Sequence, residues 1–455
     1  MSPFNLRMIG LLGLMGLVGG CGAGGPTSGP DAGADAGTGP DTEAATSLED
    51  PTGFFGPDEL RELEEFEPLG PLPDDPTNAV AEDEKAAHFG QFLFYDTRLS
   101  GNGEVSCATC HQPDHGFADP EPLSEGMGTT DRHAPTLLNT SYNRWYFWDG
   151  RADSTWAQTH SPLEAPNEQG ISRVEIAHVL FDNPELKSAY EAVFGPLPDL
   201  SDGDRFPDAG RPVPDDTDHP EHQKWIGMAQ EDRQAINRVL ANVGKAIGAY
   251  ERRIVSRNAP FDRFMEGLRE GDAGKVDALS DAQKRGLRLF VGKANCNECH
   301  LGAYLSDREF HNLGLPRRGW LAPMDLGRYD GVRTVKNDPF NALGPFSDAP
   351  DSKSGDEIRF LVRKSENRGQ FKTPTLRNVE QTDPYMHGGH FETLEEVVDF
   401  YADLDGQVIV GHREESLEEF ELTDRESADL VAFLKSLTGR PVDEALKSQP
   451  DRPLP

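Results

Sequence analysis

The chain is short of basic residues for its length. Its 455 residues include 44 Lys and Arg against 79 Asp and Glu, so the formal net charge is −35. Nucleic acid and anionic lipid both attract net basic surfaces, so this deficit argues against either as a charge-driven partner. The composition fits a soluble protein whose partner is small or basic.

Long apolar runs are also missing. The longest, residues 8–20 (MIGLLGLMGLVGG), has about 13 residues, whereas a membrane-spanning helix needs about 20. Behind Arg7, this run has the layout of a secretory signal peptide. Its end at Cys21 resembles a bacterial lipobox, so we predict a lipoprotein signal peptide over 1–20 and lipidation of Cys21. The alternative is an ordinary signal peptide with an incidental free thiol.

The segment after Cys21 has almost no bulky apolar side chains. Residues 22–50 contain no aromatic residue and a single Leu. Such a segment cannot bury enough apolar surface to offset its ordering entropy. We therefore predict a disordered Gly/Ala/Asp/Pro tether over 21–50. It would connect a lipid anchor, the only contact with a membrane, to a folded protein in the periplasm.

Cysteine is scarce, but four of the five form two motifs, Cys107-Ala-Thr-Cys110-His111 and Cys296-Asn-Glu-Cys299-His300. In a Cys-x-x-Cys-His motif the two thiols bond covalently to one haem, and the His lies under the iron as its ligand. A zinc site would need a second Cys or His pair near each motif, and none follows at such spacing. The sequence therefore predicts two covalently bound haem c groups, with His111 and His300 on the irons.

The spacing of apolar residues predicts a mainly α fold. Helices are expected over 85–96, 231–254 and 281–290, and a last helix is expected between a cap at Thr423 and a stop at Gly439. We expect two cytochrome c-like haem domains with long loops, preceded by the tether. The predicted boundaries are an N-terminal haem domain over 51–255 with an insertion at about 195–222, a C-terminal haem domain over 256–440, and a tail over 441–455.

The sequence around the motifs resembles the bacterial dihaem cytochrome c peroxidase and MauG family, from about residue 80 to 440. The matching segments are GQFLFYDTRLSGNGEVSCATCHQPDHGFAD (90–119), RHAPTLLNTSYN (132–143), FWDGRADSTWAQ (147–158), FKTPTLRNVEQTDPYMHGGHFETLEEVVDFY (371–401) and SADLVAFLKSLTG (427–439). This resemblance implies that peroxide reacts at the N-terminal haem and that electrons enter at the C-terminal one.

The resemblance also assigns catalytic residues. Glu168 matches the distal Glu that moves protons during O–O cleavage, a task that a carboxyl group suits. Gln158 matches a Gln on the same side, and Trp148 matches a Trp between the haems. From the residues alone, Glu168 would be a solvated loop acid, Gln158 a polar helix residue and Trp148 a core aromatic.

Two axial positions separate the branches of the family. The sixth ligand of the C-terminal haem is a Met in peroxidases and a Tyr in MauG, and the matching position is Tyr401. Met386 is a nearby competitor, and a core aromatic is the alternative role for Tyr401. In peroxidases a loop His also binds the resting N-terminal haem, whereas the matching position in this sequence is Met127. We predict no gating His; the alternative is Met127 as a weak ligand.

The family binds one calcium ion between the haems through an Asn side chain and two backbone carbonyls. The carbonyl positions correspond to Thr382 and Pro384, while the Asn position is His133. Calcium prefers oxygen ligands. A calcium ion held by Thr382 and Pro384 is therefore expected, with its side-chain ligand in doubt.

The resemblance implies an oxidoreductase of the cytochrome-c peroxidase type. It would reduce hydrogen peroxide to water with electrons from a small donor protein, a cytochrome c or a cupredoxin. The first alternative is a MauG-like oxidant that uses high-valent iron to oxidise a protein or a small organic substrate. The second is a non-catalytic dihaem electron carrier. Family members often form homodimers, and nothing in the sequence decides the oligomeric state.

Overall fold

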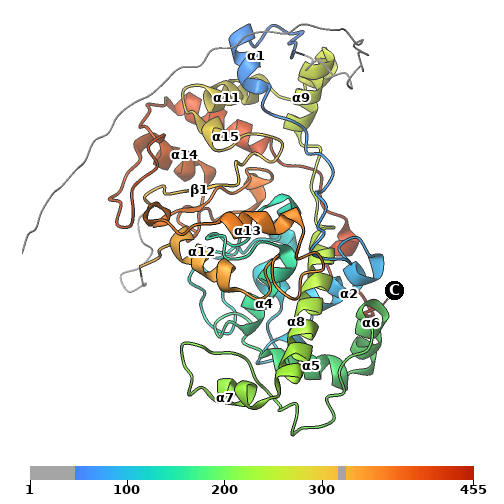
Figure 1. Cartoon of the computed structure of the whole chain (residues 1–455). Coiled ribbons are helices and arrows are strands. Elements are labelled where there is room, and N and C mark those ends of the chain that lie inside the picture. Colours follow the sequence, from blue (N-terminus) through green and yellow to red (C-terminus); the bar gives the residue numbers. More distant parts are fainter. Residues whose placement is uncertain (1–46, 316–323, 455) are drawn as a thin grey trace, which may run out of the picture. The chain divides into compact units, whose positions relative to one another are not determined.

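The computed structural model describes residues 47–315 and 324–454 (Figure 1). The expected signal peptide, Cys21 and nearly all of the tether fall in residues 1–46, outside the described part. The described residues belong to one compact unit, Thr46–Pro455.

The fold is mainly helical, which confirms the predicted class. The only strands among the described residues are β1 (Phe310–His311) and β2 (Phe371–Lys372), which pair antiparallel. The α-helices are α1 (Pro57–Leu63), α2 (Glu84–Phe94), α3 (Cys107–Cys110), α4 (Thr155–Glu164), α5 (Arg173–Asp182), α6 (Pro184–Phe194), α7 (Pro220–Gly227), α8 (Gln230–Glu251), α9 (Pro260–Glu270), α10 (Ala273–Val276), α11 (Asp281–Val291), α12 (Arg328–Asn337), α13 (Asp356–Phe360), α14 (Leu394–Asp403) and α15 (Asp424–Lys435). Short 3₁₀ helices lie at Thr97–Leu99, Pro113–His115, Thr140–Tyr142, Cys296–Glu298, Lys353–Gly355, Ser365–Asn367, Val379–Gln381 and Glu444–Leu446. No described helix combines the length and the apolar character that crossing a membrane requires.

The four helices expected from the sequence correspond to α2, α8, α11 and α15. The cap of α15 is as predicted, because the Thr423 side chain accepts a hydrogen bond from the backbone N–H of Glu426. The predicted stop at Gly439 is wrong, since α15 already ends at Lys435. Gly439 instead donates its N–H to Asn378 Oδ1 at 2.9 Å, which fixes the chain after the helix.

Two helix crossings bring distant parts of the chain into close contact, and each depends on a glycine. In α2, a Cβ added at Gly90 would lie 1.8 Å from the carbonyl oxygen of Ala246 in α8. In α11, a Cβ added at Gly286 would lie 2.0 Å from the carbonyl oxygen of Asp429 in α15. In the sequence, the first Cys-x-x-Cys-His motif lies between α2 and α8, and the second lies between α11 and α15. Each motif is therefore flanked by two helices that are in close contact with each other.

Gly286→Ala is expected to lower the free energy of unfolding by about 1–3 kcal/mol, the usual cost of overpacking a core. The same change at an open helical position would stabilise the helix by about 1 kcal/mol. Thermal unfolding followed by circular dichroism measures the difference. Gly227→Ala, at the end of α7, is the matched control, because a Cβ there meets nothing within 4 Å. A Gly286→Ala protein more stable than the wild type would contradict the close crossing of α11 and α15.

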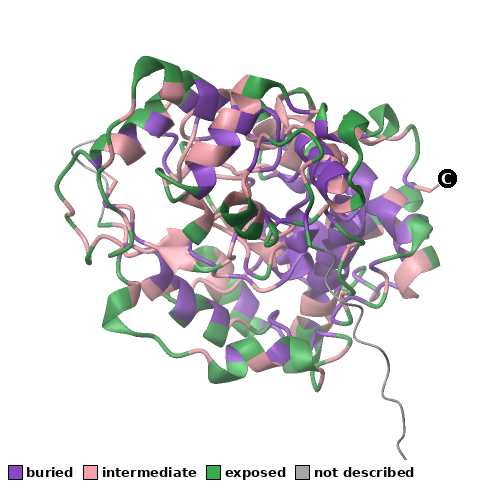
Figure 2. Ribbon diagram, turned by 90° about the horizontal axis from the view of Figure 1, so that it is seen from above, coloured by how far each residue is buried: buried purple, intermediate pink, exposed green. Residues whose placement is uncertain are grey.

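Buried apolar residues form two main clusters, and each packs against one motif. The first centres on α2, α4, α5 and α8 and includes partly buried Cys107. The second centres on α9, α11 and α15 and includes partly buried Cys296. Figure 2 shows buried stretches inside the molecule and exposed ones along its rim. The two cores agree with two haem domains, although the exact boundaries stay predictions.

Both ends of the described chain join these cores. Phe55, Leu63 and Phe66 pack in the second cluster. Val442, in the segment after α15, is buried in the first cluster. The same C-terminal segment contacts α2, because Gln91 Nε2 donates to the carbonyl oxygen of Ala445 at 2.6 Å. Chain connectivity therefore ties the two cores together at both ends.

Candidate dihaem site

The first motif folds as a single helical turn. In α3 the side chains of Cys107 and Cys110 are three residues apart, so they lie on one face of the turn. The N–H of Ser106 donates to Thr109 Oγ1 at 3.0 Å and closes the turn. His111 ends it, and its Nδ1 lies 3.2 Å from the carbonyl oxygen of Phe117. A proton on Nδ1 is thereby satisfied, which leaves Nε2 free to bind a metal.

The second motif repeats this geometry. Residues Cys296–Glu298 form a 3₁₀ turn, and His300 Nδ1 lies 3.1 Å from the carbonyl oxygen of Leu305. Burial lowers the pKa of both His111 and His300, so both rings are neutral, as a metal ligand must be. All four motif cysteines are free thiols. The donor set at each motif, two thiols and one imidazole with a free Nε2, therefore fits a covalently bound haem.

One cavity of about 1120 Å³ joins the two motifs. Ligand pockets in proteins usually enclose ~300–1,000 Å³, so this one exceeds the space of a single small ligand. Its lining includes every residue predicted for the haem, catalytic and calcium sites except Cys107, which lies half-buried at the start of α3: Cys110, His111, Trp148, Gln158, Glu168, Cys296, Cys299, His300, Thr382, Pro384 and Tyr401. The fold thus brings together residues as far apart in the sequence as Cys110 and Tyr401, which are separated by 291 positions.

Gln158 and Glu168 face this cavity from α4 and the turn after it. The position of α4 is set by α8, where a Cβ at Gly244 would lie 2.4 Å from the carbonyl oxygen of Trp156. Burial raises the pKa of Glu168, although Arg151 partly opposes this effect. A carboxyl group with a raised pKa exchanges protons closer to neutral pH than an exposed Glu does. Glu168 is therefore suited to proton transfer in the cavity.

Trp148 lines the cavity that the two motifs share, and the turn that carries it is tightly fixed. Its indole Nε1 donates to the carbonyl oxygen of His133 at 2.8 Å, and its own carbonyl oxygen accepts from the N–H of Lys372 at 2.7 Å. Gly150, two residues on, has φ +65°, and a Cβ there would lie 2.4 Å from the Phe310 ring. The FWDGR sequence therefore needs its glycine to hold the indole in place.

The charges beside Trp148 are paired. Burial alone would raise the pKa of Asp149, but Arg151 and Arg132 outweigh burial and lower it. Arg132 Nη1 lies 2.8 Å from Asp149, and Arg132 Nε lies 2.9 Å from Asp325. These ion pairs keep Asp149 ionised next to the cavity and fix the turn that carries Trp148.

Tyr401 reaches the cavity from α14. Burial raises the pKa of its phenol, and the nearby thiols of Cys296 and Cys299 raise it further. This places Tyr401 on the side of the second motif, where the sequence predicts an axial ligand. Met386 also lines the cavity, so the structure leaves the choice between the two side chains to experiment.

Within the loop that lines one side of the cavity, Met127 points to the surface. Met127 is 43 % exposed, and it is absent from the described residues that line the cavity. The N–H of Met127 donates to the carbonyl oxygen of Glu168 at 2.8 Å. This hydrogen bond helps to fix Glu168. That the resting N-terminal haem has no sixth ligand stays a prediction.

The expected calcium site has an unfavourable side chain. His133 is buried, and its Nδ1 lies 3.2 Å from the carbonyl oxygen of Glu121. Burial lowers the pKa of His133 to about 4, so the imidazole is neutral. It offers calcium a nitrogen where an oxygen is preferred. His133 therefore does not fit the calcium site, and calcium binding through the carbonyls of Thr382 and Pro384 stays a prediction.

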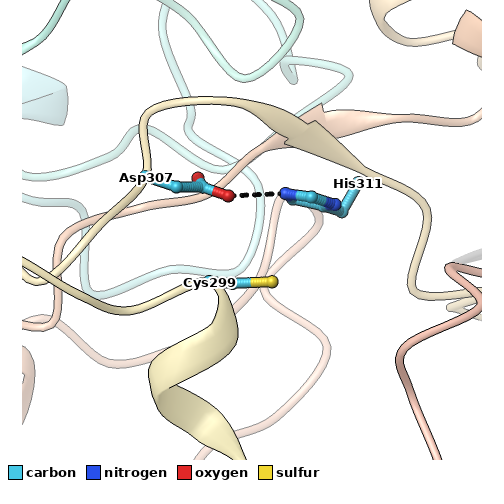
Figure 3. Close-up of side chains that lie close together, drawn as sticks. All are labelled: Cys299, Asp307 and His311. Atoms are coloured by element: carbon cyan, nitrogen blue, oxygen red, sulfur yellow. Dashed lines mark hydrogen bonds and ion pairs between the residues drawn. The ribbon is translucent and has the colours of Figure 1, made fainter. Parts of the chain in front are cut away.

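Sequence reasoning missed an ion-pair cluster beside the second motif. His311 Nε2 lies 2.7 Å from Asp307 (Figure 3). Its Nδ1 lies 2.7 Å from Glu414. Hydrogen bonds to Asp307, Cys299 and Glu414 raise the pKa of His311 to about 11, despite its burial. Cys299, Asp307 and His311 have the spacing of metal ligands, but the Cys299 sulfur belongs to the haem motif. The cluster therefore places an imidazolium cation next to the second haem site.

Two buried titratable groups in the cavity were also missed. Burial raises the pKa of Glu251, at the end of α8, to about 8, and it lowers the pKa of Lys372 to about 8. Both line the cavity. In the sequence, Glu251 is recognisable only as a polar residue at the end of the apolar face of a helix. This pattern is weak evidence for a functional residue.

The site therefore defines a c-type cytochrome with two haem motifs on one cavity. The model of the family described as di-haem cytochrome c peroxidase matches residues 84–270. The chain is 33% identical to the cytochrome-c peroxidase IdrP1 of Denitromonas iodatirespirans over 381 residues, which cover 82% of this chain and 87% of that protein. It is 32% identical to the methylamine utilization protein MauG of Methylorubrum extorquens over 373 residues, 81% of this chain and 82% of that protein.

Solved structures agree with this relationship. A MauG-like protein associated with microbial copper homeostasis matches with a TM-score of 0.59 and 26% identity, over 84% of this chain and 97% of that one. The chain belongs to the di-haem cytochrome c peroxidase and MauG family. It is accordingly a protein with two haem c groups, and its relatives include both peroxidases and MauG proteins.

Proposed function

We propose that this protein is a peroxidase that reduces hydrogen peroxide to water with electrons from an external donor. The observation that carries the proposal is that Glu168 and Gln158 line the same cavity as His111. A protein that only carries electrons has no need for a proton-transfer group beside one haem. The family relationship supports the same reaction, because several relatives are peroxidases.

The reaction consumes one peroxide, two electrons and two protons, and it gives two waters. Two haem groups held by Cys107, Cys110 and His111 and by Cys296, Cys299 and His300 would supply the redox chemistry that O–O cleavage needs. The Glu168 carboxylate takes a proton from one peroxide oxygen and returns it to the other, which leaves as water. Gln158 orients the peroxide by hydrogen bonds. Trp148, which lines the cavity that the two motifs share, provides an aromatic bridge for electrons.

Stopped-flow absorbance tests the proposal directly. We expect a fast spectral change when peroxide is mixed with the fully oxidised protein, because no His is expected on the resting N-terminal haem. A change that appears only after one electron has been added would show that this haem carries a sixth ligand in the resting state. No reaction in either state would overturn the proposal and identify the protein as an electron carrier.

A MauG-like oxidation of a protein or small organic substrate is the second candidate function. The position of Tyr401 in the cavity beside the thiols of the second motif favours it. A phenolate ligand stabilises oxidised iron relative to a thioether ligand. Steady-state assays separate the two functions, since a peroxidase turns over with a reduced donor protein and peroxide alone.

The proposed location is the periplasm, with an anchor at Cys21 as the only attachment to a membrane. The apolar run over 8–20 and the two haem c motifs support export, since c-type haem suits an exported protein. The donor is then a small periplasmic redox protein, a cytochrome c or a cupredoxin.

A further inference from the structure

Two neighbouring apolar side chains stand out on the surface. Phe360 and Val362 are 75 % and 62 % exposed, the highest values among the large hydrophobic side chains of the described residues. Between them, Leu361 turns inward and packs beside Trp145, Val335 and Ile358. The backbone at Leu361 is extended, so residues on either side of it point outward together. An isolated exposed apolar residue needs no explanation, whereas an exposed pair on one face does.

A rim of basic residues surrounds this pair. Residues 328–368 hold eight Lys or Arg and seven Asp or Glu, a net charge of +1 in a chain of net charge −35. Arg333 and Arg363 pair with Asp330, and Arg359 pairs with Asp356, whereas no ion pair is formed by Lys336, Lys353, Lys364 or Arg368 among the described residues. Only Arg328 of the eight is buried. The basic surface therefore consists of Phe360 and Val362 with the exposed residues Arg333, Lys336, Lys353, Arg359, Arg363, Lys364 and Arg368.

Specific contacts hold this basic surface together as one unit. Lys336 Nζ donates to the carbonyl oxygen of Leu361 at 2.5 Å, and Arg363 Nε donates to the carbonyl oxygen of Tyr329 at 2.8 Å. The guanidinium groups of Arg363 and Arg368 lie 3.6 Å and 4.7 Å from the centre of the Tyr329 ring. In Figure 1, α12 and α13 are the two neighbouring orange helices that carry much of this surface.

The basic surface is also directly connected to the turn that carries Trp148. In α12, a Cβ at Gly331 would lie 2.1 Å from the carbonyl oxygen of Asp149. Arg328 Nη1 donates to the carbonyl oxygen of Gly150 at 2.6 Å. Asp330, which accepts from Arg363 at 3.0 Å, lines the cavity. A protein bound on this surface would therefore be separated from the Trp148 turn by a single helix.

We propose that the basic surface is the docking site of a small acidic electron-donor protein. The inference rests on the proposed function, because it concerns the donor that this function requires. The strongly negative net charge of the chain repels an acidic donor, whereas the exposed cations of this surface attract it, so the charges help to orient it. The exposed apolar pair would be buried in the complex, as the centre of an interface usually is. A basic donor would instead be repelled from this face.

Binding of acidic plastocyanin to the holoprotein tests the proposal by isothermal titration calorimetry, which needs no turnover. Arg333→Glu/Lys364→Glu is expected to weaken binding about tenfold at low salt, with a smaller effect at high salt. Phe360→Ser is expected to weaken it about tenfold at any salt concentration. The matched controls are Arg425→Glu and Ile226→Ser, which change an exposed Arg on α15 and an exposed Ile on α7.

Turnover of each variant with peroxide is then measured with two donors, reduced plastocyanin and a small organic dye. Loss of plastocyanin oxidation with normal dye oxidation supports the docking site. Failure of the dye reaction in the wild type would refute the peroxidase function and leave the binding result intact. Plastocyanin binding that is unchanged in all variants would overturn the proposal. So would preferential binding of a basic cytochrome c, or of phosphatidylglycerol vesicles in a manner that depends on Phe360.

Discussion

Glu168→Gln is expected to lower kcat for peroxide reduction by about two to four orders of magnitude, the usual contribution of a general acid–base group. The amide keeps the size and polarity of the side chain, but it cannot take up a proton. Haem content and the absorbance spectrum of the oxidised protein should not change, because Glu168 is not a ligand of either haem. Steady-state assays with peroxide and a dye donor measure the effect.

The pH profile gives an independent check on Glu168. Burial raises its pKa above that of an exposed Glu, so the carboxylate that accepts the first proton forms only at higher pH than usual. The kcat/KM of the wild type should rise with pH through this raised pKa, and Glu168→Gln should remove that limb. Glu125→Gln, at an exposed Glu on the neighbouring loop, is the control. A Glu168→Gln enzyme with wild-type kcat would exclude Glu168 as the proton carrier.

Tyr401→Met is expected to raise the reduction potential of the C-terminal haem by on the order of 0.1 V or more, within the ~0.8 V range that axial ligands set. A thioether favours reduced iron relative to a phenolate, so the substituted protein should accept electrons more easily. It should also react more slowly with peroxide in the fully oxidised state. Spectroelectrochemistry measures the potential, and stopped-flow absorbance measures the rate.

Tyr401→Phe and Met386→Leu distinguish the two candidate ligands. Tyr401→Phe removes the oxygen but keeps the ring that packs against Phe400 in α14. If Tyr401 binds the iron, Tyr401→Phe changes the spectrum of the C-terminal haem and Met386→Leu does not. The reverse result would assign the ligand to Met386 and place the protein with the Met-ligated peroxidases.

The sequence was most informative where function depends on short spacing. Each Cys-x-x-Cys-His motif places two thiols and one imidazole within five residues, and both motifs contribute residues to one cavity. Apolar periodicity also located α2, α8, α11 and α15, because helices bury one face at a regular interval. The end of α15 was missed, since Gly439 stabilises the following turn and not the helix itself.

Groups that act through distant contacts could not be found in this way. His311 pairs with Asp307, four residues before it, but also with Glu414, 103 residues further along the chain, and no local pattern joins His311 to Glu414. The burial of Glu251 and Lys372 also depends on how several loops close over the cavity. The basic surface around Phe360 was hidden by the strongly negative total charge, because a net charge does not show where the charges lie.

The paired helix crossings at Gly90 and Gly286 have a consequence for how the chain folds. Each crossing joins residues far apart in sequence, α2 with α8 and α11 with α15, and each encloses one motif. Closing such long loops is entropically costly, so these contacts form late and slow the folding of the whole protein. Because the same closure occurs twice around two separate cores, we expect hydrogen exchange to detect two regions that open with different free energies.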